Sequence, residues 1–431
     1  MSRIIITIVL LLFLMLFLTR INTGDSATHM AESMMALGFT LIVSYLIGKS
    51  LKQFKLPKIT GYILAGILVG PYLINLLSVP VVKNLQLIDN IALSLIALTA
   101  GGEFRYKKIR SQFKIIGNAI VWQILIVMAG FLIFIFLYRN HISFLEGQSA
   151  EIAIGVALLF GALSIAKSPA TTIAIITEYK ASGPYTDFVL GVTVFKDIIV
   201  VLIFSIVLSL AKPLILQQED IQFIYFMNVF FEIILSIVLG MMAGIIILLY
   251  LKFIGQQKVL FLLGFVLLGI ELSHFLHLEV ILFFMVAGFF VQNFSNAGSE
   301  LIEAIEEGSL PVYVIFFTIA GASLNFPVFM QNYILALLIV ALRLLTTYLG
   351  TYTGGKLAGA SEGVNRYGWM GFIGQAGLTL GLAVITRKNI PGPIGLGIST
   401  LIISSIAINQ IIGPVLFRHA IVKVGEVHRK D

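Results

Sequence analysis

A lysine and an aspartate, Lys196 and Asp197, are adjacent in the middle of residues 188–210, a stretch that is otherwise uncharged and long enough to span a bilayer. A charge at the centre of a membrane-spanning helix costs about 2.5–3.5 kcal/mol to insert. Two further cations, Lys167 and Arg343, also lie within apolar segments. Ionisable residues at that depth usually face a protein interior and take part in ion or proton transport. These four residues are therefore the first candidates for a functional site.

The composition is that of a polytopic membrane protein. Hydrophobic residues make up 59% of the 431 residues and charged residues only 11%, whereas about a quarter of the residues of a soluble domain are charged. The chain has no cysteine, which excludes disulfides and thiolate metal sites. We find no phosphate-binding loop, dinucleotide fingerprint or catalytic triad. We therefore expect neither an enzyme nor a bound cofactor.

Apolar runs bounded by charges, glycine or proline predict an all-α fold with about 14 transmembrane helices. Their approximate limits are 4–19, 31–51, 58–80, 85–102, 113–138, 150–177, 184–211, 222–251, 257–276, 278–294, 309–325, 331–357, 364–386 and 393–420. A short basic start followed by an apolar run also describes a signal peptide. We interpret the first run as a retained anchor.

The basic residues fix the predicted orientation. With the N-terminus in the cytoplasm, 19 of the 28 Lys and Arg residues fall on the cytoplasmic side, six fall outside and three stay in the bilayer. This distribution satisfies the positive-inside rule. The net charge of +7 therefore reflects topology rather than a nucleic-acid surface. We expect a multi-pass protein of the inner (plasma) membrane with both termini in the cytoplasm and no nucleic-acid partner.

Two pairs of glycine-containing segments indicate an internal repeat. The Ala-Gly steps of GYILAGILVGP (61–71) and IALTAGGEF (96–104) are 35 residues apart, and those of ILFFMVAGFFVQN (281–293) and FFTIAGASLNF (316–326) are 33 residues apart. Such self-similarity between two halves is typical of secondary transporters.

We predict a chain organised around these two halves. Residues 31–211 and 257–420 each hold six helices, and one linker helix lies in 212–256, so the halves have opposite orientations in the membrane. Residues 1–30 form an extra helix and loop, and 421–431 a cytoplasmic tail. The predicted fold is thus two inverted-topology six-helix repeats.

One helix in each half contains residues that break a helix. LSIAKSPATT (163–172) includes a proline, and GFIGQAGLTLG (371–381) is rich in glycine. Broken helices expose free carbonyls and half-helix dipole ends at the membrane midplane. Four side chains near these breaks are candidate oxygen ligands for a hard cation, although each is also an ordinary polar packing residue: Ser168, Thr171, Thr193 and Gln375.

Taken together, these motifs resemble the monovalent cation:proton antiporters, the Kef-type and sodium/hydrogen-exchanger group. The resemblance extends over residues 31–420 and includes LPKITGYILAGILVGPYL (56–73), the AGGEF and AGASLNF helix ends, the SPATT and GQAG breaks, and the position of Lys196-Asp197. It implies that Asp197 carries the ion and the proton and that Arg343 is the basic residue of the core. The family usually has Asp-Asp, Asn-Asp or Gln-Asp at 196–197, so Lys196 is a departure, as is Lys167 in the broken helix.

The site residues each admit two interpretations. Asp197 either carries the ion or is a structural carboxylate paired with Arg343 or a lysine. Lys196 either forms a fixed salt bridge or gives up a proton when a cation reaches Asp197. Lys167 either acts similarly or caps carbonyls left free at the break. We interpret Arg343 as structural, because a guanidinium does not deprotonate.

The charges of the site leave the sign of the substrate open. One aspartate against three cations gives −1 + 3 = +2, which would repel a cation if all four groups stayed ionised. Either a lysine is neutral for much of the cycle or the substrate is an anion. The hypothesis that best fits the motifs is a secondary active transporter, a homodimer in the lipid bilayer, that exchanges sodium or potassium for protons by an elevator-type movement. The alternatives are a proton-coupled anion carrier and a transport-dead sensor or assembly subunit.

Overall fold

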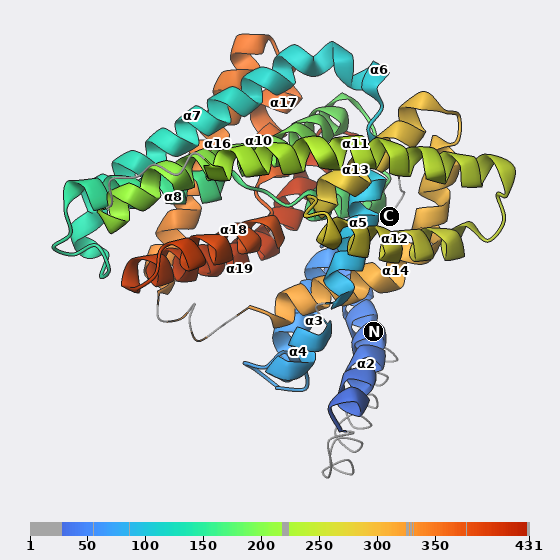
Figure 1. The fold of residues 1–431 in the computed structure, drawn as a ribbon, viewed down its shortest axis with the longest axis horizontal. Coiled ribbons are helices and arrows are strands. Elements are labelled where there is room, and N and C mark those ends of the chain that lie inside the picture. The colour runs from blue at the N-terminus through green and yellow to red at the C-terminus, as the bar shows by residue number, and fades with distance from the viewer. Residues whose placement is uncertain are drawn as a thin grey trace.

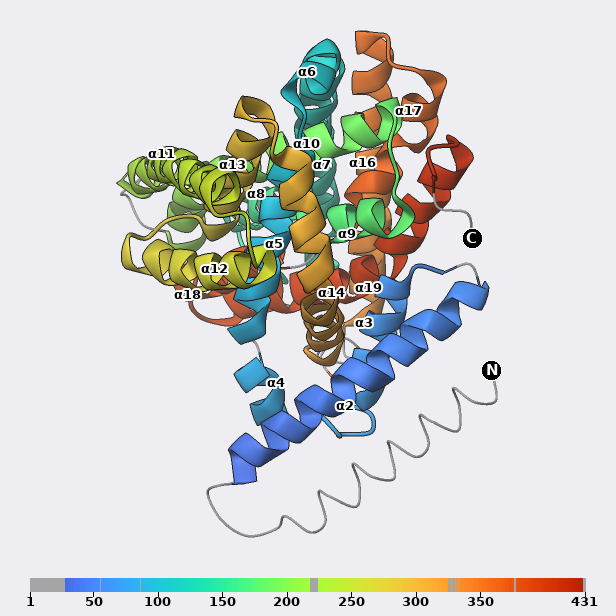
Figure 2. The same cartoon turned by 90° about the vertical axis from the view of Figure 1, so that its right-hand side faces the viewer.

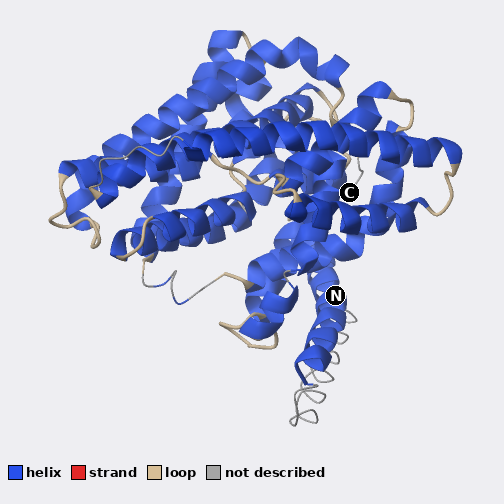
Figure 3. Cartoon of the chain, in the orientation of Figure 1, coloured by secondary structure: helices blue, strands red, loops and turns tan. Residues whose placement is uncertain are grey.

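The computed structural model describes residues 28–54, 56–85, 87–217, 224–324, 327, 330, 332–375 and 377–428. All regular elements in these residues are helices (Figure 3), as the composition predicts. The helix predicted at 4–19 lies outside the described residues. The principal helices are α2 (Thr28–Leu51), α3 (Lys58–Val69), α4 (Val79–Leu85), α5 (Leu87–Glu103), α6 (Tyr106–Ile109), α7 (Phe113–Tyr138), α8 (Ala150–Ile165), α9 (Pro169–Tyr179), α10 (Pro184–Leu216), α11 (Ile224–Phe253), α12 (Lys258–Phe275), α13 (Val280–Phe294), α14 (Gly298–Ala322), α16 (Tyr333–Ala358), α17 (Glu362–Tyr367), α18 (Gly377–Asn389) and α19 (Pro393–Lys423).

Nine segments of the described chain are long and apolar enough to cross a membrane, and α3 and α13 are shorter apolar helices. The predicted total of about 14 spans stays a prediction. Three predicted limits differ clearly from the structure, one of which is the end of the helix predicted at 184–211, since that helix continues to Leu216. The helix predicted at 58–80 ends at Val69, because Pro71 disfavours the helical conformation of Gly70. The helix predicted at 309–325 begins at Gly298.

The early start of α14 has a local cause. Its first turns are rich in glutamate, which is a good helix former. A prediction based on apolar runs places a helix boundary at such charged residues and so begins the helix too late. Glu300 also pairs with Lys258 at the start of α12, with Nζ and Oε1 2.5 Å apart. The amphipathic extension is therefore fixed to the neighbouring helix at its end.

The helices pack in two groups (Figure 1). In the first, α7 packs on α8 and α16, α8 on α10, and α19 on α16 and α18. Phe131, Phe160, Ile339 and Ile402 belong to the hydrophobic cluster of this group. In the second, α3 packs on α14, α5 on α13, and α13 on α11. Figure 2 shows α2 beside α3 and α4, on the far side of the second group from α7 and α16.

Glycines let the helices of the second group cross at very short range. A methyl group at Gly66 of α3 would collide with the Thr318 carbonyl of α14, and one at Gly321 of α14 would collide with the Ile63 carbonyl of α3. Gly101 of α5 and Gly288 of α13 are related in the same reciprocal way.

These four glycines are the glycines of the Ala-Gly steps. Each crossing joins a helix of the first predicted half to a helix of the second, α3 to α14 and α5 to α13. A two-fold relation between the halves would produce this pairing. The pairing supports the inverted repeat, which stays a prediction.

The crossing of α5 and α13 provides a stability test. Gly101→Ala is expected to lower the stability of the folded protein by about 1–3 kcal/mol, because the added methyl group forces the α13 backbone away. The control is Gly117→Ala on α7, where a methyl group meets no atom within 4 Å and alanine is the better helix former. Melting temperatures in detergent should fall for the first variant alone. Equal melting temperatures would show that the crossing tolerates a side chain.

Candidate ion-binding site

Two helices are interrupted side by side. The first break separates α8, which ends at Ile165, from α9, which begins at Pro169. Ser168 caps α9: its Oγ accepts a hydrogen bond from Thr171 N at 3.2 Å. The second break precedes α18 and follows a 3₁₀ turn at Gly368–Phe372. The two breaks bond to each other directly, since Ser168 N donates to the Gly374 carbonyl at 2.8 Å.

Arg343 of α16 ties both breaks together. Its side chain is buried, with 1% of its surface exposed, and donates four hydrogen bonds to backbone carbonyls. The acceptors are Ser164 O at 2.9 Å and Ala166 O at 3.0 Å in the first break, and Phe372 O at 3.0 Å and Ile373 O at 2.7 Å in the second. These are the carbonyls that interrupted helices leave without a partner. Arg343 thus satisfies free carbonyls in both breaks, whereas Lys167 hydrogen-bonds to hydroxyl groups.

Gln375 and Asn409 add to this arrangement. Gln375 Nε2 donates to Leu163 O and Ala166 O, each at 3.2 Å. Asn409 of α19 in turn donates to Gln375 Oε1 at 2.8 Å. The amide of Gln375 is therefore occupied in holding the two breaks in position.

The two buried lysines bind uncharged oxygens. Lys167 Nζ hydrogen-bonds Thr193 Oγ1 and lies 3.5 Å from Thr172 Oγ1. Lys196 Nζ donates to Gln123 Oε1 at 2.6 Å. Both ammonium groups also lie near the face of Phe372, 5.2 Å and 5.7 Å from the ring centroid, which is within the range of cation–π attraction.

Gln123 is a site residue that the sequence reasoning missed. It lies on α7, is fully buried, and its Nε2 donates to Thr351 Oγ1 of α16 at 2.9 Å. The sequence contained a signal for Gln123: it is an amide within a long apolar helix, and such an amide needs a hydrogen-bond partner. Lys196 is thus linked through Gln123 to α16, the helix that carries Arg343.

Asp197 faces away from Lys196, since adjacent helical residues point about 100° apart. Only 8% of its surface is exposed, and no described group hydrogen-bonds its Oδ1. The carboxylate lines a cavity of about 10 Å³, close to the minimum that holds one water molecule. The other lining residues are Ile198, Val201, Ile233, Glu279, Leu282, Met285 and Leu378. A buried carboxylate oxygen without a partner is strongly unfavourable, so a cation or a proton would be stabilised there.

The predicted oxygen ligands have other partners in this structure. Ser168 caps α9, Thr193 binds Lys167, and Gln375 holds the breaks. Thr171 is buried beside Ser168 and Gly374. The structure therefore gathers all four around the breaks without giving any of them a hydrogen bond to Asp197. Their role as ion ligands stays a prediction.

The start of α10, the helix that carries Lys196 and Asp197, is fixed by the C-terminal segment. Glu426 accepts hydrogen bonds from Tyr185 N, Thr186 N and Thr186 Oγ1, each at 2.7 Å. A carboxylate at a helix N-terminus is favourable because the helix dipole is positive there. The end of α19 and the start of α10 are therefore joined at the side that the charge distribution predicts to be cytoplasmic.

Comparison with known proteins assigns the family. The model of the sodium/hydrogen exchanger transmembrane family matches residues 37–420, which include every residue of the candidate site. The chain belongs to this family. It is therefore a membrane protein of the sodium/hydrogen exchanger group, as its motifs imply.

Relatives of this sodium/hydrogen exchanger family member bear consistent names. The Na(+)/H(+) antiporter of Enterococcus hirae is 21% identical over 328 residues, 75% of this chain and 81% of that protein. A protein of Methanocaldococcus jannaschii named "Probable Na(+)/H(+) antiporter 3" is 25% identical over 171 residues, which is 39% of this chain and 40% of that protein. The structure of the sodium proton antiporter MjNhaP1 from M. jannaschii at pH 8 matches with a TM-score of 0.68 at 17% identity, covering 92% of this chain and 99% of that one. That similarity identifies the fold.

Proposed function

We propose that this sodium/hydrogen exchanger family member is a secondary active transporter that exchanges a monovalent cation, sodium or potassium, for protons. The observation that carries the proposal is the Asp197 carboxylate, buried next to two interrupted helices with an oxygen that has no described partner. A proton and a cation would compete for this carboxylate, and that competition is the minimum that antiport requires. The names of the two curated relatives support the same activity.

Alternating access would come from movement of one helix group against the other, as in an elevator. In this proposal α7–α10 and α16–α19 form the moving core, while α2–α5 and α11–α14 form the stationary scaffold and, by family resemblance, a homodimer contact.

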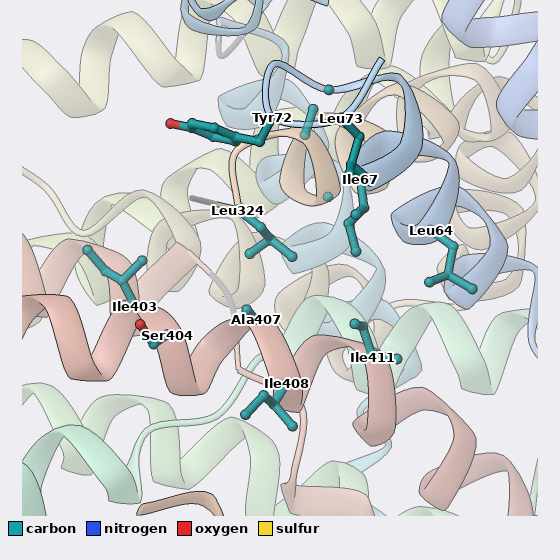
Figure 4. A pocket seen from close by; sticks show the side chains of 13 residues that line it. Leu64, Ile67, Tyr72, Leu73, Leu324, Ile403, Ser404, Ala407, Ile408 and Ile411 are labelled. Atoms are coloured by element: carbon teal, nitrogen blue, oxygen red, sulfur yellow. The ribbon is translucent and has the colours of Figure 1, made fainter. Parts of the chain in front are cut away.

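The apolar lining of the core–scaffold boundary supports this movement. A pocket of about 260 Å³ lies between α3 and α14 on one side and α19 on the other, with Ile67, Leu324 and Ile411 among its lining residues (Figure 4). Sliding across such a surface breaks few hydrogen bonds.

Glu178 and Lys58 form a polar contact across the same boundary. Both oxygens of Glu178, at the end of α9, accept from Lys58 N at the start of α3, at 2.9 and 3.1 Å. An elevator movement would have to break this cap. The cap would therefore stabilise the conformation seen here.

Lys167, Lys196 and Arg343 lie around the breaks, and these positive charges make an anion the alternative substrate. The charge sign of the transported ion therefore distinguishes a cation antiporter from an anion carrier. Purified protein in proteoliposomes that contain a pH-sensitive dye is expected to respond to added sodium or potassium salts whatever the anion. A response that follows chloride or an organic anion and ignores the cation would favour the anion carrier. No response to any salt would favour a protein without transport activity.

A further inference from the structure

The cavity that Asp197 lines contains a second carboxylate, that of Glu279 at the start of α13. We propose that Glu279 is a second ligand for the transported cation in the conformation seen here, in which Asp197 of the moving core and Glu279 of the stationary scaffold together form a two-carboxylate binding site. The inference rests on the proposed function, because it presupposes that the cation reaches Asp197. Neither the family motifs nor the sequence pattern gave Glu279 a role.

Among the described residues, Glu279 and Asp197 are the only charged ones that line the cavity, and the other lining side chains are apolar. The two carboxylates interact electrostatically across it. Two like charges in an apolar cavity repel each other strongly unless a cation or a proton lies between them. The cavity is large enough for about one water-sized particle. A small monovalent cation bound by carboxylate oxygens satisfies both groups, since hard cations prefer oxygen ligands.

Hydrogen bonds to two helices, α13 and α11, fix the position of Glu279. Its Oε2 accepts from Leu282 N at 2.7 Å, which caps α13. Its backbone N donates to Ser236 Oγ of α11 at 2.8 Å, and Ser236 Oγ donates to the Glu232 carbonyl at 2.6 Å. A carboxylate held in this way is preorganised for a ligand and loses little conformational entropy on binding.

Glu279 also changes the charge of the site. With Asp197, Lys167, Lys196 and Arg343 the sum was +2, and the second carboxylate lowers it to +1. Glu232 on α11 is partly exposed, and it interacts electrostatically with Glu279 and with His277. It would bring the sum to zero. The acidic side chains thus continue from Asp197 to Glu279 and on to Glu232, and they give a cation a favourable approach.

A purely structural interpretation competes with this one, because Glu279 is an N-cap. The two roles separate in Glu279→Gln, whose amide oxygen can still accept from Leu282 N although the charge is gone. We expect the sodium concentration for half-maximal exchange to rise at least tenfold, with a melting temperature in sodium-free buffer close to that of the wild type. Sodium should also raise the melting temperature of the variant less than that of the wild type, because it binds the folded state more weakly.

Two further variants complete the experiment. Glu271→Gln removes an exposed acid near the end of the adjacent helix α12 and should leave the sodium dependence unchanged. Glu279→Asp keeps both charge and cap and should stay within about threefold of the wild type. Should Glu279→Gln fail to fold, Glu279→Asn, a favourable N-cap, tests the same loss of charge.

A wild-type sodium dependence in Glu279→Gln, or in Glu279→Asn where Gln does not fold, overturns the two-carboxylate site. The proposed function is judged separately by Asp197→Asn. If that variant loses exchange while Glu279→Gln is normal, the antiporter stands and the second ligand does not. If Asp197→Asn exchanges normally, Asp197 is not the carrier, and the observation on which the proposed function rests is overturned together with the two-carboxylate site.

Discussion

Asp197→Asn is expected to abolish cation-dependent proton movement in everted vesicles and to leave the protein folded. The amide is nearly isosteric with the carboxylate, so the packing of α10 against α11 and α13 should persist. It carries no charge to attract a cation and cannot take up and release a proton near neutral pH. Because Oδ1 has no described hydrogen-bond partner, the substitution strands no donor, and the stability of the variant should equal or exceed that of the wild type.

The control for this variant is on the same helix. Asp187→Asn neutralises an acid in the first turn of α10, well before the site, and should retain exchange. Both variants should elute as the wild type does in gel filtration and differ little in melting temperature. Exchange at the wild-type rate in Asp197→Asn would remove this carboxylate from the mechanism and would mean that another group carries the cation and the proton.

Much of the architecture was predictable because lipid imposes simple rules on sequence. The helix at Phe113–Tyr138 has the predicted limits, since charges and polar residues bound a continuous apolar run. The breaks near Pro169 and Gln375 lie within the segments predicted for them, because proline and glycine act locally on the backbone. α14 was predicted too short because its acidic first turns are helical but not apolar.

The sequence predicted that four charged side chains lie at membrane depth, and the structure shows them buried, but the sequence did not predict which groups they contact. Burial identifies Asp197, Lys167, Lys196 and Arg343 as functional or structural necessities, yet it does not say which groups meet. That depends on the rotation of α10, which directs Lys196 toward Gln123 of α7 and Asp197 toward α11 and α13. Partners from distant segments, such as Gln123 and Glu279, leave only a weak signal in sequence. In the sequence, Glu279 lies at the end of a predicted helix, where a solvated side chain is expected. Only the packing of the helices shows that it lines the same cavity as Asp197.

Arg343→Met is expected to cause the largest loss of stability among the variants considered. The substitution keeps a long side chain but removes the guanidinium donors to four buried carbonyls, two in each break. Among the described residues, only Ala166 O keeps another donor, Gln375 Nε2. Removing one partner from a buried charged network typically costs about 3–5 kcal/mol, and each buried carbonyl left without a donor costs about 1–3 kcal/mol unless water reaches it. A folded domain is commonly stable by only about 5–15 kcal/mol. Little folded protein should therefore be recovered at growth temperature.

Arg343→Lys distinguishes geometry from charge. Lysine keeps the positive charge but offers three donors from one point, whereas the planar guanidinium reaches acceptors on two separate breaks. We expect an intermediate melting temperature and impaired exchange, because one break is then held less firmly beside Asp197.

The matched control is Arg366→Met, which removes an exposed guanidinium from α17 and should change stability by less than about 0.5 kcal/mol. Melting in detergent and exchange in proteoliposomes should be measured on the same preparations. An Arg343→Met protein that melts and transports as the wild type does would show that the breaks hold their positions without the guanidinium.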